Sequence, residues 1–151
     1  MKLARVGATA AIVALATVAW AQKPDFSGTW TLDPPAATAA GGGGDALGNG
    51  PATIKQTADT LTIERAMSGA AVTLTYKLDG TDSRNMLMGE GGQQADSLST
   101  VKWDGPKLTI VTKQEMDGRL TESTQVWTVQ GSTLTVETTN ARGSQKRVYR
   151  K

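Results

Sequence analysis

Three segments of the chain alternate threonine with an aliphatic residue. They cover residues 60–64 (TLTIE), 107–112 (KLTIVT) and 133–138 (TLTVET), and each begins just after a turn signal. Successive side chains of an extended chain point to opposite faces, so each segment has one apolar face and one face of hydroxyl groups. The pattern predicts antiparallel strands that bury one face and pair as hairpins.

Nine or ten segments along the chain have the character of strands, and none has a convincing amphipathic helix pattern. Strong turn signals such as Asp79-Gly80 and Asp117-Gly118 separate them. A meander of hairpins loses its unpaired edges when it closes on itself. We therefore expect an all-β fold, an antiparallel up-and-down β-barrel of 8–10 strands, with a sandwich as the alternative. The expected strands cover residues 28–33, 52–57, 60–66, 71–78, 83–88, 98–103, 107–115, 119–129, 133–138 and 145–150.

Residues 1–21 have the three parts of a secretory signal peptide. Residues 1–5 are basic, residues 6–18 form a small apolar run, and Ala19-Trp20-Ala21 fits the cleavage rule. The apolar run is shorter than the roughly 20 residues of a spanning helix, so an uncleaved anchor is the less favoured alternative. We expect residues 22–151 to form a single domain that is periplasmic or secreted.

Charge and cysteine content limit the partners of this domain. Loss of Lys2 and Arg5 with the leader lowers the formal net charge from +2 to zero, and the chain has no cysteine. Nucleic acids and anionic membranes attract clustered cations, so we expect neither as a partner. An outer-membrane barrel needs strands of roughly 9–11 residues with an apolar outer band, whereas most of these segments are shorter and their outer faces carry Thr, Gln, Lys and Glu. We expect a soluble monomer without membrane insertion.

Residues 34–51 interrupt the series of strands. Pro34-Pro35 begins this stretch, residues 41–44 are four glycines, and Pro51 ends it. Ordering so many glycines is entropically unfavourable when there is little to bury. We expect a flexible loop, although residues 36–40 have the composition for one helical turn.

The residues that most often carry chemistry are missing. The chain has no histidine and no cysteine, which removes the usual general base, the thiol nucleophile and the commonest zinc ligands. We expect no enzyme activity, no cofactor and no metal site. Glu115, Asp117 and Glu122 are close in sequence, but acids around a turn are normally solvated, so a carboxylate-based hydrolase is disfavoured. Met86 and Met88 have the sulfur ligands that suit Cu(I), but core packing or a cavity mouth is the favoured role.

The two ends of residues 22–151 resemble a known superfamily. Phe26-Ser27-Gly28-Thr29-Trp30 is similar to the opening of the fatty-acid-binding proteins and, more loosely, of the lipocalins, and residues 146–149 (KRVY) resemble their arginine-x-tyrosine ending. More narrowly, the chain resembles exported bacterial lipocalin-like proteins of the calycin superfamily. The resemblance implies a barrel with an internal cavity for a lipid or other apolar molecule. It also implies that Arg147 and Tyr149 hold the carboxylate of this ligand. It also implies a helical lid, which the loop at 34–51 replaces.

Aromatic residues are the other candidates for the interior. Phe26, Gly28 and Trp30 are expected at one end of the barrel, where Trp30 plugs the end and Gly28 lets a neighbouring backbone approach. Core packing is favoured over ligand contact for Trp30. Three further aromatic residues are candidates to line or fill a cavity, namely Tyr76, Trp103 and Trp127.

The last strand leaves its orientation open. Arg147 and Tyr149 share one face and Val148 has the other, and alternation favours Val148 inward. An inward Arg147 needs a partner, either an internal carboxylate such as Glu122 or an anionic ligand. The sequence thus predicts noncatalytic binding of a small hydrophobic or amphipathic, lipid-like ligand. The alternative is a structural or protein-interaction module with a filled barrel.

Overall fold

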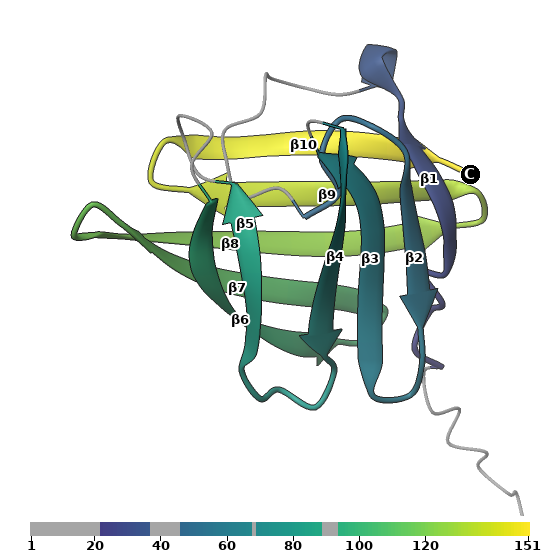
Figure 1. The fold of residues 1–151 in the computed structure, drawn as a ribbon. Helices are drawn as coiled ribbons and strands as arrows, with labels where there is room; N and C mark the ends of the chain where they lie inside the picture. Colours follow the sequence, from purple (N-terminus) through teal and green to yellow (C-terminus); the bar gives the residue numbers. More distant parts are fainter. Residues whose placement is uncertain (1–21, 37–45, 68, 89–93) are drawn as a thin grey trace, which may run out of the picture.

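The structure, a computed structural model, describes residues 22–36, 46–67, 69–88 and 94–151. In these residues ten antiparallel strands form one sheet that curls into a nearly closed barrel, with β2–β5 crossing in front of β6–β10 (Figure 1). The expected fold class is confirmed. The expected signal peptide at 1–21 and residues 37–45 of the expected loop lie outside the described residues.

The sheet follows the chain as a meander. Its strand order is β4-β3-β2-β1-β10-β9-β8-β7-β6-β5, so β1 pairs with β10 and joins the two halves. Among the described residues, the one helical element is the short 3-10 helix η1 (Pro34–Ala36), and no helix is long and apolar enough to cross a bilayer. The strands are β1 (Gly28–Leu32), β2 (Ala52–Gln56), β3 (Thr60–Met67), β4 (Ala70–Lys77), β5 (Ser83–Met88), β6 (Gln94–Asp104), β7 (Lys107–Met116), β8 (Arg119–Gln130), β9 (Thr133–Asn140) and β10 (Gly143–Arg150).

Alternation places the aliphatic residues inside. Ile54 of β2 pairs with Ile63 of β3, which pairs with Leu74 of β4, and these three side chains are at most 1% exposed. Burial of each such side chain contributes roughly 1.5–3 kcal/mol. The two-residue hairpin turn between β7 and β8 has positive φ at both Asp117 (50°) and Gly118 (72°). Positive φ at both positions gives the turn a twist that matches the right-handed twist of the flanking strands, and Asp-Gly tolerates it.

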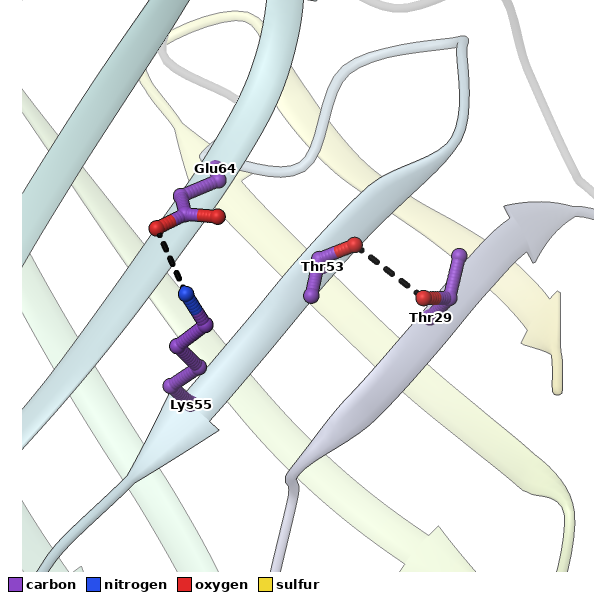
Figure 2. A network of polar contacts seen from close by, with 4 residues as sticks. All are labelled: Thr29, Thr53, Lys55 and Glu64. Carbon is purple, nitrogen blue, oxygen red and sulfur yellow. Dashed lines mark hydrogen bonds and ion pairs between the residues drawn. The ribbon is translucent and has the colours of Figure 1, made fainter.

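Polar side chains meet across the outer face. The Thr29 and Thr53 hydroxyls lie 3.1 Å apart between β1 and β2, and Lys55 Nζ lies 2.9 Å from Glu64 Oε1 between β2 and β3. Figure 2 draws both contacts as dashed lines. Cross-strand pairs of this kind contribute roughly 0.2–1 kcal/mol each. They identify this face of β1–β3 as the solvated one.

Side chains bridge the seam between β4 and β5, which lie side by side but have no backbone ladder in the described pairing (Figure 1). The side-chain amide of Asn85 accepts from Thr75 N–H at 2.8 Å and donates to Thr75 O at 3.0 Å. Ser83 Oγ accepts from Lys77 N–H at 2.7 Å. These contacts take the place of ladder hydrogen bonds and close the barrel.

Aromatic rings surround Phe26 at the start of the described chain. The Phe26 ring stacks on Trp103 with centroids 6.1 Å apart and meets Trp127 edge-on at 5.9 Å, and Trp30 Nε1 donates to Phe26 O at 2.8 Å. Gly28 has φ +136°, and an added Cβ would collide with the Lys151 side chain. The atoms nearest to such a Cβ belong to the Lys151 side chain, and the close approach of a neighbouring backbone to Gly28 stays a prediction.

Candidate functional site

Arg147 and Tyr149 of β10 face the barrel interior. Their side chains are 6% and 0% exposed, and they pair in register with the buried residues Val136 and Leu134 of β9. The expectation that Val148 faces inward was wrong. The helix η1 lies against β10, and Val148 is only 9% exposed on the opposite face, so an apolar residue is accommodated outside the barrel.

Arg147 lies at the end of an otherwise apolar row. In register, Arg147 pairs with Val136, which pairs with Trp127, which in turn pairs with Leu108. Val136, Trp127 and Leu108 are at most 1% exposed. A guanidinium group in such surroundings needs oxygen acceptors, because burial without them is strongly unfavourable.

The segment of residues 46–50 supplies acceptors to both side chains of the pair. Arg147 Nη1 donates to Asn49 Oδ1 at 2.8 Å, and Tyr149 Oη donates to Gly48 O at 3.0 Å. Ala46 and Leu47 are at most 1% exposed and belong to the hydrophobic core cluster. This part of the expected loop therefore packs inside the barrel.

A patch of neutral polar side chains covers part of the inner wall. Ser99 and Thr112 hydroxyls lie 2.8 Å apart, and Gln114 Nε2 donates to Leu87 O at 3.2 Å. Gln125 Oε1 accepts from Trp127 Nε1 at 3.0 Å. On β5–β9 these hydroxyl and amide groups share the inner face with apolar side chains such as Leu108 and Trp127, whereas the buried side chains described on β2 and β3 are all apolar. Besides Arg147, the buried polar residues described are Ser83, Asn85, Ser97, Ser99, Thr112, Gln114, Gln125 and Thr138.

The predicted aromatic candidates occupy two regions. Tyr76 of β4 pairs in register with Leu61 and is 1% exposed. Trp127 is fully buried and Trp103 is half-buried, with Lys23 Nζ 5.2 Å above the Trp103 ring. Trp103 and Trp127 share Phe26 as a packing partner, so the structure brings them together in the aromatic cluster described above.

The acids singled out in the sequence lie on the surface. Glu115, Asp117 and Glu122 are exposed, and Glu122 Oε2 lies 3.9 Å from Lys113 Nζ. Glu122 is therefore not the internal partner of Arg147, because its position on β8 directs it outward. Among the described residues no cluster of three or more acidic residues has metal-ligand geometry.

The methionine pair does not lie in the core as a unit. Leu87 is 1% exposed and faces inward, so alternation directs its neighbour Met86 outward, and Met86 is 53% exposed. The expectation of core packing was wrong for Met86, and a place at a cavity mouth stays a prediction. The side chain of Met88 lies outside the description.

An open hollow of about 470 Å³ lies beside the β3–β4 hairpin. Arg65 of β3 reaches the 46–50 segment there, because a Cβ added to Gly48 would collide with its guanidinium group. The Arg65 Nε atom is buried and has no hydrogen-bond partner among the described residues. The hollow is lined by Pro51, Glu64, Arg65, Ala66, Gly69, Ala71, Val72 and Thr73.

Solved structures share this architecture. A mutant of the fluorescent protein UnaG matches with a TM-score of 0.55 and 21% identity over 83% of this chain and 95% of its own. Human cRBP IV matches with a TM-score of 0.56 and 23% identity over 85% and 98%. The fold is fatty-acid-binding-protein-like. The REP1-NXSQ fatty acid transporter shares this fold with a TM-score of 0.55 and 14% identity over 83% and 94%.

The likeness is one of fold, since sequence identity to these barrels is low. A comparison with protein-family models finds no match, and a comparison with curated proteins finds none either. The fatty-acid-binding-protein-like barrel nevertheless agrees with the motifs at 26–30 and 146–149.

Sequence reasoning missed the residues that meet Arg147 and Tyr149. The signal for them is weak but present, because Leu47 is the one large aliphatic residue in the stretch 34–51. The neutral polar patch was also missed. Ser83, Asn85 and Leu87 lie two residues apart and therefore share one face of β5. Once Leu87 is placed in the core, Ser83 and Asn85 are identified as inward-facing too.

Proposed function

We propose that this protein binds a small amphipathic, lipid-like ligand inside the barrel and catalyses no reaction. The observation that carries the proposal is the inward placement of Arg147 and Tyr149 beside a row of buried apolar residues. A guanidinium and a phenol hydroxyl donate together to two oxygens, which suits a carboxylate or similar oxygen-bearing head group. The fatty acid transporter among the structures of this fold supports this ligand class.

The inner walls suit a ligand with both apolar and polar parts. Ile54, Ile63 and Leu74 provide an aliphatic surface on β2–β4, whereas β5–β9 combine neutral polar groups such as Ser99 and Thr112 with buried apolar side chains. Binding sites for small molecules usually combine apolar lining with a few polar groups that fix orientation. We therefore propose an amphipathic ligand with hydrogen-bonding groups beyond its head group.

The proposal includes export and a monomeric state. Export and the monomeric state are proposed from the signal-peptide pattern at 1–21 and from the absence of cysteine. Native mass spectrometry of protein purified from its host is expected to show a chain beginning at Gln22 with a copurifying lipid. A ligand-free mass together with failure to bind added fatty acids would contradict the proposal.

Two probes test head-group recognition directly. Dansyl-labelled undecanoic acid and its methyl ester share the same apolar body, but only the acid carries a carboxylate. We expect the acid to bind more tightly than the ester, and we expect Arg147→Gln to lower this acid-to-ester preference by about tenfold or more, since a hydrogen bond to a charged group contributes about 1.5–3 kcal/mol. Fluorescence titration measures both affinities.

Arg150→Gln is the matched control. Arg150 lies on the same strand but is exposed, and its Nε lies 3.0 Å from Asp33 Oδ2. We expect this variant to keep the acid-to-ester preference of the unmodified protein. Equal affinities for acid and ester in the unmodified protein would exclude Arg147 and Tyr149 as the head-group site.

A barrel without a ligand is the second candidate, and one observation favours it. Ala46 and Leu47 fill part of the interior and belong to the core cluster. A structural or protein-interaction module needs no cavity. If the protein is such a module, neither probe is expected to bind to the unmodified protein or to any variant.

A further inference from the structure

The 46–50 segment makes the contacts that a ligand's head group is proposed to make. Gly48 O accepts from Tyr149 Oη at 3.0 Å, and Asn49 Oδ1 accepts from Arg147 Nη1 at 2.8 Å. We propose that this segment is an internal competitor, which occupies the head-group site in the ligand-free protein and must leave it when ligand binds. This inference rests on the function proposed above and describes the regulation of that same site.

The chemistry of the segment matches that of the proposed ligand. Two neighbouring oxygens, one on the backbone and one on an amide side chain, engage the phenol and the guanidinium as the two oxygens of a carboxylate would. The fully buried Leu47 supplies an aliphatic group just before these oxygens in the chain. A buried Arg147 is thereby satisfied without a ligand, which removes the energetic penalty of an empty site.

The segment is held in a way that permits release. Residues 46–50 belong to no strand or helix, and Asn49 and Gly50 are exposed. A neutral amide oxygen is also a weaker acceptor for a guanidinium group than a carboxylate oxygen is. An anionic ligand therefore replaces weaker hydrogen bonds with stronger ones.

Gly48 is a position at which an added side chain would disturb the conformation of the segment. Its φ is +69°, a conformation that other residues adopt only at an energetic penalty, and a Cβ there would collide with the Arg65 guanidinium. Gly48→Ala therefore disfavours the seated conformation without touching Arg147 or Tyr149. Asn49→Ala removes the acceptor for Arg147 from an exposed position, so it preserves the core.

Competition predicts a specific pattern of affinities. When only part of the population is open, the measured affinity of any interior ligand falls by the fraction that is open. Gly48→Ala and Asn49→Ala are therefore expected to bind dansyl-undecanoic acid and its methyl ester more tightly, each by roughly three- to tenfold. The acid-to-ester preference is expected to stay unchanged, because both probes displace the same segment.

Gly131→Ala is the matched control. Gly131 also has a positive φ (+57°), but a Cβ added there has no heavy atom within 4 Å, and the residue lies in the turn between β8 and β9. The Gly131→Ala substitution imposes similar backbone strain, but at a turn distant in sequence from residues 46–50. We expect its affinity for both probes to equal that of the unmodified protein.

The outcomes separate this inference from the proposed function. Unchanged or weaker binding in both Gly48→Ala and Asn49→Ala overturns the competition, because the segment is then either irrelevant or part of the site. Tighter binding of both probes without any preference for the acid supports the competition and overturns the head-group assignment. Absence of binding in every variant overturns both.

Discussion

At the scale of single residues, hydrogen bonds from a residue two positions later lower the pKa of two carboxyl groups. The Thr81 hydroxyl and backbone N–H donate to Asp79 Oδ1 at 2.6 and 2.9 Å and lower the pKa of Asp79 below its ordinary value of 3.8. The side-chain and backbone donors of Ser27 lower the pKa of Asp25 in the same way, with a smaller contribution from Lys151. Both groups favour the ionised form because donors stabilise a carboxylate.

These shifts give the fold a defined dependence on acid. A carboxyl group whose pKa is lower in the folded than in the unfolded state stabilises the fold above the unfolded value of 3.8, and this contribution is lost as the pH falls through the folded pKa. NMR titration of side-chain carboxyl carbons is expected to give midpoints below 3.8 for both Asp25 and Asp79. Thr81→Val is expected to raise the Asp79 midpoint and leave the Asp25 midpoint unchanged. A midpoint of Asp79 that does not respond would contradict the assigned cause.

At the scale of elements, the seam between β4 and β5 depends on side chains. Asn85 is 8% exposed and makes two hydrogen bonds with Thr75. Asn85→Ala is expected to lower the free energy of unfolding by about 1–3 kcal/mol, since it leaves buried polar groups unpaired. Amide exchange at Thr75 is expected to accelerate. Chemical denaturation and hydrogen exchange measure the two effects.

A second asparagine provides the comparison. Asn140 Oδ1 accepts from Arg142 N–H at 2.9 Å in the turn between β9 and β10, where water can replace the bond. Asn140→Ala is expected to change the free energy of unfolding by less than about 1 kcal/mol. An equal loss of stability in the two variants would show that the seam is no more dependent on its side chain than an exposed turn is.

The elements themselves were predictable to a large extent. Alternation and turn signals placed all ten strands, including the weak segment 83–88, because a period of two survives even where single residues are polar. The orientation of β10 was not predictable from alternation. Both faces of this strand are covered, one by the interior and one by η1, so Arg147, Val148 and Tyr149 are all buried.

The candidate site was predictable only in part. The resemblance singled out Arg147 and Tyr149, and the structure places both inside. Their contacts with Gly48 and Asn49 join positions about a hundred residues apart in sequence. No local pattern encodes such a contact, since it depends on how the connection between β1 and β2 folds against β10.

At the scale of the whole molecule, the described interior of the barrel combines an apolar core, a patch of neutral polar side chains on β5–β9 and the buried Arg147 guanidinium group. Natural cores rarely bury so many polar side chains without a structural or functional reason. Asn85 and Ser83 have a structural reason in the seam between β4 and β5. Arg147 has none in the strand ladder itself, and the ligand proposed for it accounts for its place in an apolar row.

An NMR titration of the isotope-labelled protein with a long-chain fatty acid tests the central claim most directly. Ligand binding inside the barrel is expected to shift the Arg147 Nε–H signal and the indole N–H signal of Trp127, both of which belong to inward-facing side chains. Signals of the exposed Lys55 and Glu64 on the outer face are expected to stay in place. Unchanged signals throughout, or shifts confined to the outer face, would contradict interior binding.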